Sequence, residues 1–225
     1  AIDIGDFDND GYDDIIIAGA IDTNNDYKAD KSILYIYRND NGVFTELADA
    51  NLYGLHLASV KFIDIDNDGD LDIVVMGQNY ENIAKHRMFI YENDNNTFKI
   101  KQELQGYIYG SIDCGDFNND GYIDFVITGF GVVTDGKPAE QVCKIFENQK
   151  NGTFKEIETN FPGVMYGCAK FIDYNNDGYL DLVTMGKTDG YPDKVLATYK
   201  NENGIFTEDQ IITPDALGNC WFDFI

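Results

Sequence analysis

Acidic side chains recur at alternate positions of a nine-residue motif that occurs four times in the chain. The copies are DFDNDGYDD at 6–14, DIDNDGDLD at 64–72, DFNNDGYID at 116–124 and DYNNDGYLD at 173–181. Oxygen ligands at positions one, three, five and nine, a backbone carbonyl at position seven and a glycine that permits a sharp turn suit a cation of the size of Ca²⁺. The motif therefore predicts four calcium sites.

Each predicted site combines four side-chain ligands with the carbonyl of position seven. The side-chain ligands are Asp6, Asp8, Asp10 and Asp14; Asp64, Asp66, Asp68 and Asp72; Asp116, Asn118, Asp120 and Asp124; and Asp173, Asn175, Asp177 and Asp181. The carbonyl donors are Tyr12, Asp70, Tyr122 and Tyr179. Because the first two copies have four carboxylates and the last two have three, we expect the first two sites to bind calcium more tightly.

Other interpretations of the motif fit less well. An EF-hand needs Glu at the twelfth position, where this chain has Ile17, Val75, Ile127 and Thr184. Zinc would require His or Cys ligands, and magnesium prefers few protein ligands with several waters. A series of Asx turns without metal is the remaining alternative, since Asp, Asn and Gly favour turns in any case.

The segments around each motif predict the strands that position it. A short apolar alternation precedes each copy, and a β-branched run ending in glycine follows it (Gly19, Gly77, Gly129 and Gly186). A segment ending in aromatic-x-Asn and a tight turn, such as Asn41-Gly42, then lead to a last segment with a phenylalanine (Phe44, Phe98, Phe154 and Phe206). Since Asn-Gly between apolar alternations favours hairpins, each repeat is predicted to form four short antiparallel strands.

A repeat of roughly 50–60 residues with four strands is typical of a propeller blade. We predict an all-β β-propeller segment over 1–225 with four blades, at 1–50, 51–105, 106–161 and 162–216. A β-sandwich is the alternative. Residues 217–225 would start a fifth repeat or close the ring, and we expect a piece of a longer chain from a propeller of six to eight blades. Repeats one and three share I-D-x-G-D-F and repeats two and four share K-F-I-D, which favours an even number.

Over its whole length the chain resembles the FG-GAP or VCBS repeats of the integrin α-subunit propeller and of secreted bacterial proteins. The motif matches that family's calcium pattern D-x-[DN]-x-D-G-x-x-D, and Tyr53-Gly54, Tyr109-Gly110 and Tyr166-Gly167 approximate its "FG". Its "GAP" is reduced to the glycine after the motif, which is nearer the bacterial style. The resemblance implies calcium in the loops between first and second strands, and ligand binding at the opposite face.

The opposite face is expected to carry tyrosines among polar residues. Tyr27, Tyr80 and Tyr191 lie in the predicted second-to-third-strand loops. Exposed aromatic rings beside amides suit stacking on sugars or docking a protein, although such rings can also pack between blades. We therefore expect a calcium-stabilised extracellular adhesion module with a carbohydrate or protein ligand. A calcium-dependent polysaccharide lyase is the enzymatic alternative, but the chain has two His and no catalytic motif.

Composition excludes other classes of function. A net charge of −24 is incompatible with a nucleic-acid-binding surface, and no apolar run is long enough to span a membrane. Exposed calcium loops suit millimolar extracellular calcium, so we expect a secreted or cell-surface protein. The four cysteines, Cys114, Cys143, Cys168 and Cys220, are interpreted as small buried side chains.

Overall fold

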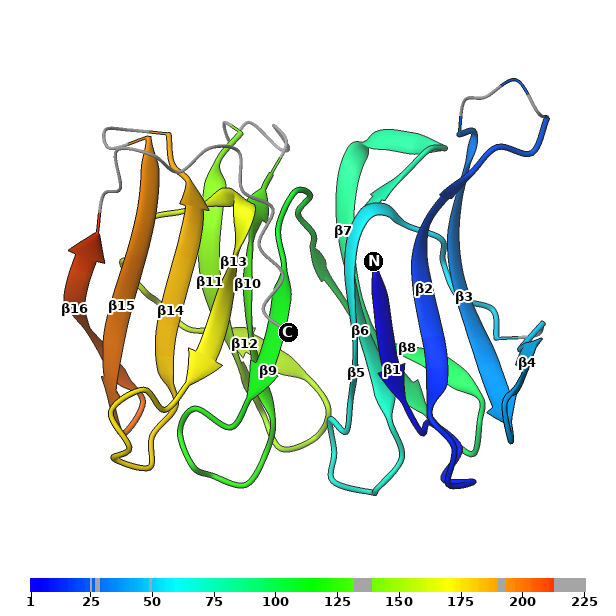
Figure 1. Ribbon diagram of the computed structural model, residues 1–225, viewed down its shortest axis with the longest axis horizontal. Helices are drawn as coiled ribbons and strands as arrows, with labels where there is room; N and C mark the ends of the chain where they lie inside the picture. Colours follow the sequence, from blue (N-terminus) through cyan, green and yellow to red (C-terminus); the bar gives the residue numbers. More distant parts are fainter. Residues whose placement is uncertain (25, 27–28, 49, 132–138, 190–192, 213–225) are drawn as a thin grey trace. The chain divides into compact units, whose positions relative to one another are not determined.

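The chain folds into four antiparallel β-sheets. The computed structural model describes residues 1–24, 26, 29–48, 50–131, 139–189 and 193–212. Sixteen strands form four four-stranded sheets, and the described part of the chain contains no helix (Figure 1). Strands that follow one another in sequence are neighbours within each sheet. The prediction of an all-β fold built from four-stranded antiparallel blades is confirmed.

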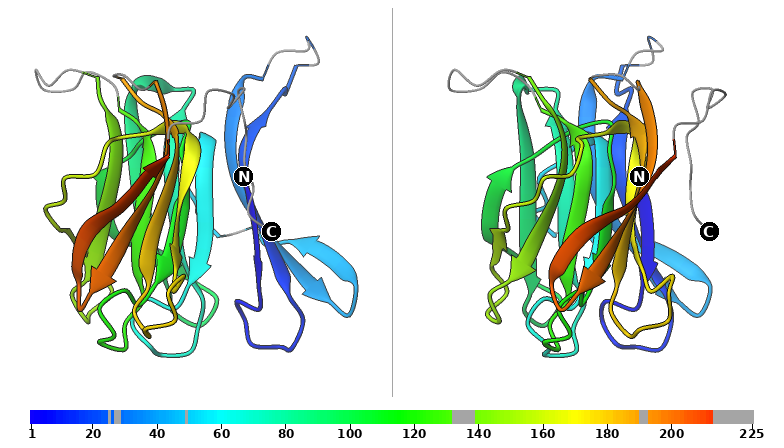
Figure 2. Two further views of the ribbon diagram at one scale, coloured as in Figure 1. Left: turned by 60° about the vertical axis from the view of Figure 1, so that its left-hand side comes forward. Right: turned by 90° about the vertical axis from the view of Figure 1, so that its left-hand side faces the viewer.

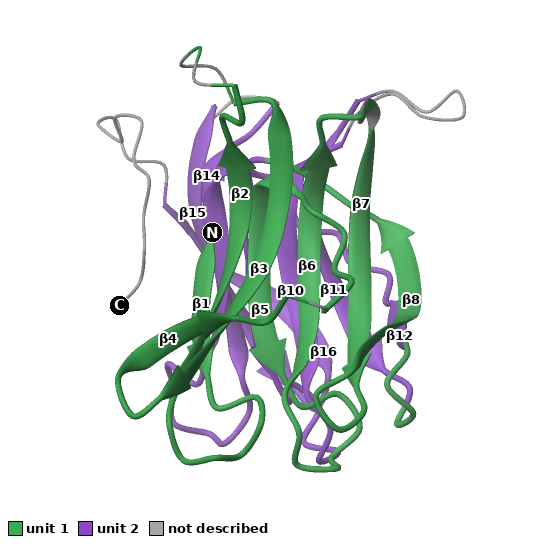
Figure 3. Ribbon diagram, turned by 90° about the vertical axis from the view of Figure 1, so that its right-hand side faces the viewer, with its two compact units in different colours: residues 1–108, 150–153 green, residues 109–149, 154–225 purple. Residues whose placement is uncertain are grey.

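Two compact units divide these sheets equally (Figure 3). Unit 1 comprises residues 1–108 and 150–153, and unit 2 comprises residues 109–149 and 154–225. The strands of unit 1 are β1 (Ile2–Gly5), β2 (Asp14–Ile21), β3 (Lys31–Asp40) and β4 (Val43–Glu46) in one sheet, and β5 (His56–Ile63), β6 (Asp72–Asn79), β7 (Asn82–Asn93) and β8 (Phe98–Gln105) in the other.

Unit 2 repeats the same arrangement. Its strands are β9 (Ile112–Gly115), β10 (Asp124–Phe130), β11 (Gln141–Asn148) and β12 (Phe154–Glu156) in one sheet, and β13 (Met165–Ile172), β14 (Asp181–Lys187), β15 (Lys194–Glu202) and β16 (Ile205–Ile212) in the other. Residues 217–225, predicted as a further first strand, lie outside the described residues.

The burial of the second strands explains their continuous apolar sequences. Residues 72–77 at the start of β6 are buried on both faces of the sheet, as are residues 124–129 of β10. A strand that is buried on both sides shows no polar alternation, so its sequence is a continuous run of apolar, largely β-branched residues. The following third strand pairs with it in regular antiparallel register, for example Val75 with Phe89.

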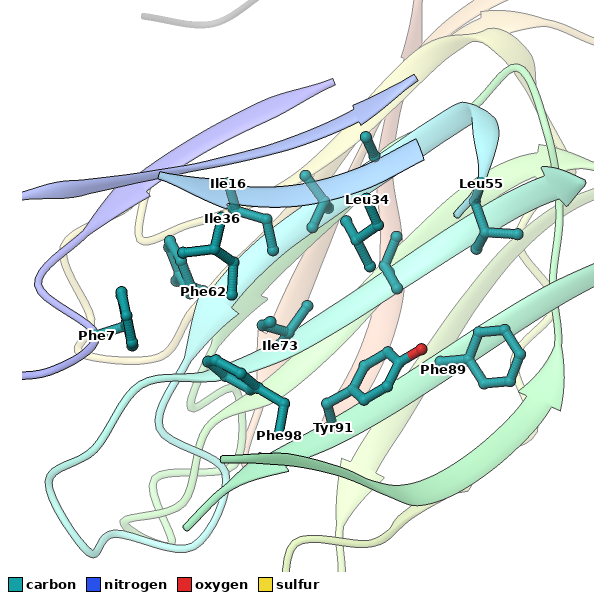
Figure 4. Packing of buried hydrophobic residues seen from close by; sticks show 13 residues of the cluster. Phe7, Ile16, Leu34, Ile36, Leu55, Phe62, Ile73, Phe89, Tyr91 and Phe98 are labelled. Carbon is teal, nitrogen blue, oxygen red and sulfur yellow. The ribbon is translucent and has the colours of Figure 1, made fainter. Parts of the chain in front are cut away.

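Aromatic residues tie the nine-residue segments to the core of each unit. In unit 1, Phe7 is 1% exposed, and its ring centroid lies 6.3 Å from that of Phe62 and 5.8 Å from that of Phe98 (Figure 4). In unit 2, Phe117 has the equivalent place and contacts the rings of Phe171 and Phe206. Burying a phenylalanine contributes about 2–3 kcal/mol, so these residues anchor the segments that precede β2 and β10.

The connections between successive strands alternate between the two ends of each antiparallel sheet. The segments joining first and second strands lie at one end of their own sheet, and those joining second and third strands lie at the other (Figures 1 and 2). The nine-residue motifs are therefore at the end of each blade opposite the connections between second and third strands.

The hairpin turns between third and fourth strands follow the prediction in three blades. Asn41 and Gly42 both have positive φ, as do the pairs Asn95-Asn96 and Asn203-Gly204. In the third blade the positive φ values fall on Lys150 and Gly152, so the turn is one residue wider than an Asn-Gly turn. The Asn151 side chain instead accepts hydrogen bonds from the N–H and hydroxyl of Thr153.

Candidate metal centre

The aspartate at position one shapes each nine-residue loop. We number the loops 1 to 4, for residues 6–14, 64–72, 116–124 and 173–181. In loop 1 the Asp6 carboxylate accepts hydrogen bonds from the N–H groups of Asp10 (3.1 Å) and Gly11 (2.8 Å). Its counterparts Asp64, Asp116 and Asp173 likewise accept two backbone N–H bonds. Gly11 has φ +93°, a conformation that favours glycine, so the sequence dictates this turn.

The aspartate at position nine is buried at the start of the second strand. Asp14, Asp72, Asp124 and Asp181 are all 0–1% exposed. In loop 2, Asp72 Oδ2 accepts the N–H of Ile65 (2.8 Å) and Oδ1 accepts the N–H of Asn93 (2.6 Å). This carboxylate therefore links the loop to the end of the third strand of the same blade.

Loops 1 and 2 each bring three acidic side chains together. Oxygen atoms of Asp6, Asp8 and Asp14 lie within 4.8 Å of one another, and so do those of Asp64, Asp66 and Asp72. Asp8 has a side chain only 3% exposed, and its Oδ1 is buried without a hydrogen-bond partner, as is Oδ1 of Asp66. Convergent carboxylate oxygens with one unpartnered, buried atom fit a hard divalent cation.

The predicted ligands at position five lie outside these clusters. Asp10 Oδ1 accepts the N–H of Tyr12 (3.0 Å), and Asp68 Oδ1 accepts the N–H of Asp70 (2.9 Å). These Asx turns direct the position-five carboxylates toward the backbone that follows them. In loop 1 the other oxygen, Oδ2 of Asp10, also contacts Arg38 (3.2 Å).

Loops 3 and 4 have asparagine at position three and a different set of contacts. Asn118 Oδ1 accepts the N–H of Asp120 (3.0 Å), and Asn118 Nδ2 donates to Glu147 (3.3 Å). Within the described residues, neither loop forms a cluster of three acidic side chains. Loop 4 instead leaves Oδ2 of Asp181 buried without a partner, because the N–H of Tyr174 donates to the carbonyl of Ile172 (3.0 Å).

Burial makes the loop carboxylates hard to ionise in the absence of a cation. It raises the pKa of Asp72 and that of Asp124 to about 7, against the hydrogen bonds from backbone N–H groups that lower them. Burial is also the main cause that raises the pKa of Asp8 and Asp66. Keeping such groups charged calls for nearby positive charge, which a bound metal ion supplies.

Comparison with known families agrees with this geometry. The model of the FG-GAP-like repeat matches residues 6–75 and residues 116–184, which together exceed half of the chain. The chain belongs to the FG-GAP-like repeat family. Each match begins at position one of an odd-numbered loop and ends in the strand after the next loop, so it spans two FG-GAP-like repeats. A search of curated proteins found no match.

An asparagine near the end of each third strand of these FG-GAP-like repeats connects several segments through hydrogen bonds, and we call it the hub asparagine. Its aromatic-x-Asn pattern is visible in the sequence, but the sequence alone did not indicate its role. Asn93 is 1% exposed, and its Nδ2 donates to the carbonyls of Leu71 (3.1 Å) and Phe7 (3.0 Å), the latter in loop 1 of the other blade of unit 1. Asn201 makes equivalent bonds in unit 2, to Leu180 and Phe117. The aromatic-x-Asn pattern could have indicated this structural role, because asparagine stands at the same position in all four repeats.

The glycines assigned to the "FG" of the repeat fall into two structural classes. A Cβ on Gly54 would lie 2.2 Å from the carbonyl oxygen of Ser32, at the end of a strand in the preceding sheet. A Cβ on Gly110 would lie 1.8 Å from the carbonyl oxygen of Thr128, and one on Gly167 would lie 1.8 Å from that of Met185. Tyr109 and Tyr166 have positive φ, whereas Tyr53 does not. Tyr53-Gly54 is therefore not equivalent to the other two pairs.

Only one of the three tyrosines predicted at the opposite end falls in the described residues. Tyr80 is 38% exposed, and its ring stacks on His56 with a centroid distance of 4.0 Å. Tyr27 and Tyr191 lie outside the described residues. Of two further tyrosines, Tyr107 is buried, and Tyr166 is exposed and packs against Tyr109.

Two remaining expectations concern membranes and cysteines. In the described residues we find no helix that could span a membrane. Cys114, Cys143 and Cys168 form no disulfide within the described part of the chain, and burial raises the pKa of Cys143 to about 12. Cys143 and Cys168 are buried and Cys114 is half-buried, while Cys220 lies outside the described residues.

Proposed function

We propose that the chain is a calcium-stabilised binding module in which loops 1 to 4 hold Ca²⁺ at one end of each blade. The observation that carries the proposal is the buried, unpartnered oxygen at position three of loops 1 and 2, in clusters of three carboxylates. Three like charges within 4.8 Å repel one another, and a buried oxygen without a partner costs free energy. Bound calcium would supply the compensating charge, and its hard oxygen-ligand preference matches the aspartates.

Thermal melting and calorimetric titration test the metal. We expect heat of binding with Ca²⁺ and a melting temperature that falls when EDTA removes the ion, because the loop carboxylates then repel one another. Asp66→Asn should weaken binding at loop 2 toward the affinity of loops 3 and 4, which have asparagine at that position, because it removes one ligand carboxylate. Asp94→Asn is the matched control, because Asp94 is exposed in the same blade and pairs with Lys99. No heat and an unchanged melt in EDTA would refute the metal sites.

We propose further that the end opposite the loops binds a glycan or protein outside the cell. Support comes from Tyr80, whose exposed ring rests on His56 and whose N–H donates to Ser32 Oγ (3.1 Å). Ser32 Oγ also bonds His56 Nδ1 (2.9 Å), so the ring is held in place before a ligand arrives. A pre-positioned aromatic ring with little entropy left to lose suits sugar stacking or a protein contact.

Glycan-array binding with paired variants tests this face. Tyr80→Ala should abolish binding without lowering the melting temperature, whereas Phe44→Ala removes another exposed ring, from β4, and should leave binding intact. Binding that survives Tyr80→Ala contradicts the assignment. Incubation with acidic polysaccharides, followed by the ultraviolet absorbance of unsaturated products, separates a binding module from a lyase.

A further inference from the structure

The residue before each hub asparagine changes charge from blade to blade. Its position is otherwise constant, at the end of the third strand and beside the loop of the same blade. The four residues are Arg38, Glu92, Glu147 and Lys200. The surrounding aromatic-x-Asn frame is retained in all four repeats, so this one position alters the charge next to otherwise similar loops.

In loop 1 this residue contacts two of the predicted metal ligands. Arg38 Nε lies 2.7 Å from Asp8 Oδ2, and its NH2 lies 3.2 Å from Asp10 Oδ2. The guanidinium therefore neutralises part of the loop and holds Asp10, the predicted ligand that stands outside the carboxylate cluster. A calcium ion bound in loop 1 would have to share or displace this side-chain cation.

Loop 4 has a weaker version of the same arrangement. Lys200 Nζ lies 3.7 Å from Asp177 Oδ2, the predicted position-five ligand, and 3.0 Å from Glu202 Oε1. Since loop 4 has three ligand carboxylates rather than four, a positive neighbour leaves it with the smallest negative charge of the four loops.

In loops 2 and 3 the same position adds negative charge. Glu147 accepts a hydrogen bond from the loop residue Asn118 (3.3 Å). Glu92 holds the same place beside loop 2, because it precedes Asn93, whose N–H donates to the loop residue Asp72 (2.6 Å). Lys101 Nζ pairs with Glu92 Oε1 (2.6 Å).

We propose that the residue before the hub asparagine sets the calcium affinity of its loop, with Arg38 and Lys200 acting as built-in competing cations and Glu92 and Glu147 as affinity-raising carboxylates. The inference rests on the proposed calcium binding and deepens it. It predicts different calcium affinities for the two loops with four carboxylates: loop 2 binds calcium most tightly, and loop 1 binds it more weakly. Loop 4 has the lowest calcium affinity of the four. Arg38 also keeps loop 1 partly neutralised when calcium is absent.

Backbone amides of the loop glycines allow each site to be followed separately. Gly11, Gly69, Gly121 and Gly178 each donate their N–H to the position-one carboxylate of their loop. In a calcium titration of the full chain by ¹⁵N NMR, we expect Gly69 to respond at the lowest concentration and Gly178 at the highest. Arg38→Gln should lower the midpoint of Gly11 by roughly two- to fivefold, the effect of an exposed ion pair, and leave Gly69 unchanged.

A second measurement separates competition from ordinary structural support. Arg38→Gln should lower the melting temperature in EDTA, since loop 1 loses its counter-charge, while it raises calcium affinity. A residue with only a structural role would weaken both. Lys31→Gln, which removes a positive charge from the other end of β3, is the matched control and should change neither.

The outcomes distinguish the two proposals. If no glycine resonance of the wild type responds to calcium, the proposed metal function fails. If the wild type responds but Arg38→Gln leaves the Gly11 midpoint unchanged, or Lys31→Gln shifts it equally, the competing-cation inference is overturned. Glu92→Gln gives an independent test in loop 2, where it should raise the midpoint of Gly69; a lowered or unaltered midpoint also counts against the inference.

Discussion

Replacing Asn93 by alanine should destabilise unit 1 by about 3–4 kcal/mol, whether or not calcium is present. The side chain is 1% exposed and makes three hydrogen bonds. Losing it leaves the buried carbonyl of Phe7 without this donor, at a cost of about 1–3 kcal/mol. The half-buried carbonyl of Leu71 adds about 1 kcal/mol and the exposed N–H of Asn96, which water can reach, adds about 0.5 kcal/mol.

Asn39 provides the matched comparison in the first blade. Its side chain also bonds a loop carbonyl, that of Asp13 (2.9 Å), and a turn N–H, that of Gly42 (2.7 Å). Both bonds are exposed, and among the described residues the Asn39 side chain has no bond to another blade, so Asn39→Ala should cost about 1–2 kcal/mol. The difference of about 2 kcal/mol isolates the bond from Asn93 to the neighbouring sheet.

Urea denaturation followed by circular dichroism measures both variants, in calcium and in EDTA. Equal losses for Asn93→Ala and Asn39→Ala would refute the role of the bond between sheets. If the excess loss of Asn93→Ala disappeared in EDTA, the hub would act through the metal loops instead, because the carbonyls that Asn93 Nδ2 binds belong to the loop residues Phe7 and Leu71.

Three further predictions follow from charge and from close packing. Burial raises the pKa of Asp72 and Asp124 to about 7, above their values in the unfolded chain, so the metal-free fold gains stability as the pH is lowered from 8 toward 6. The melting temperature in EDTA should therefore rise as the pH is lowered, and a decrease would contradict these pKa shifts. Gly110→Ala should lower the free energy of unfolding by more than about 3 kcal/mol, because the added Cβ would clash with the Thr128 carbonyl. Gly19→Ala should be nearly neutral, because no atom lies within 4 Å of the added Cβ. Equal melting temperatures for the two variants would exclude the packing explanation. Asp3→Ala should cost about 2 kcal/mol in urea unfolding and Lys61→Met less, since only the first also leaves the N–H of Phe62 unpaired; the reverse order would contradict this.

The repeated frame made the blades predictable from sequence. Strand order, the loops between first and second strands and the phenylalanines of the fourth strands all follow from patterns that recur in register. Local chemistry also fixed the turn at Gly11, since only a few residues adopt its backbone conformation. These features depend on neighbours in sequence, which is why a single sequence sufficed to predict them.

Contacts between distant segments could not be predicted in the same way. The motif predicts both Asp8 and Asp10 as calcium ligands. In the structure Asp10 Oδ1 accepts the N–H of Tyr12, whereas Asp8 lies in the carboxylate cluster with Asp6. The partner of Asn93 is Phe7, 86 residues earlier, and no local pattern indicates it. The same holds for Arg38, whose contact with loop 1 depends on where β3 ends.

The pairing of blades within each unit explains the two-repeat period of the sequence. Asp3 of β1 accepts the Nζ of Lys61 (2.9 Å) and the N–H of Phe62 (2.8 Å), both in the first strand of the next sheet. Unit 2 repeats these contacts with Asp113, Lys170 and Phe171. The residues shared by repeats one and three therefore contact those shared by repeats two and four.

Packing reinforces this complementarity. A Cβ on Gly5 would lie 2.6 Å from Cδ1 of Leu71, and one on Gly115 would lie 2.6 Å from Cδ1 of Leu180, so the glycine of I-D-x-G-D makes room for the paired sheet. Odd and even repeats are thus two different halves of one interface. The interface joins two blades in each compact unit, and each family match includes the loops of two such paired blades.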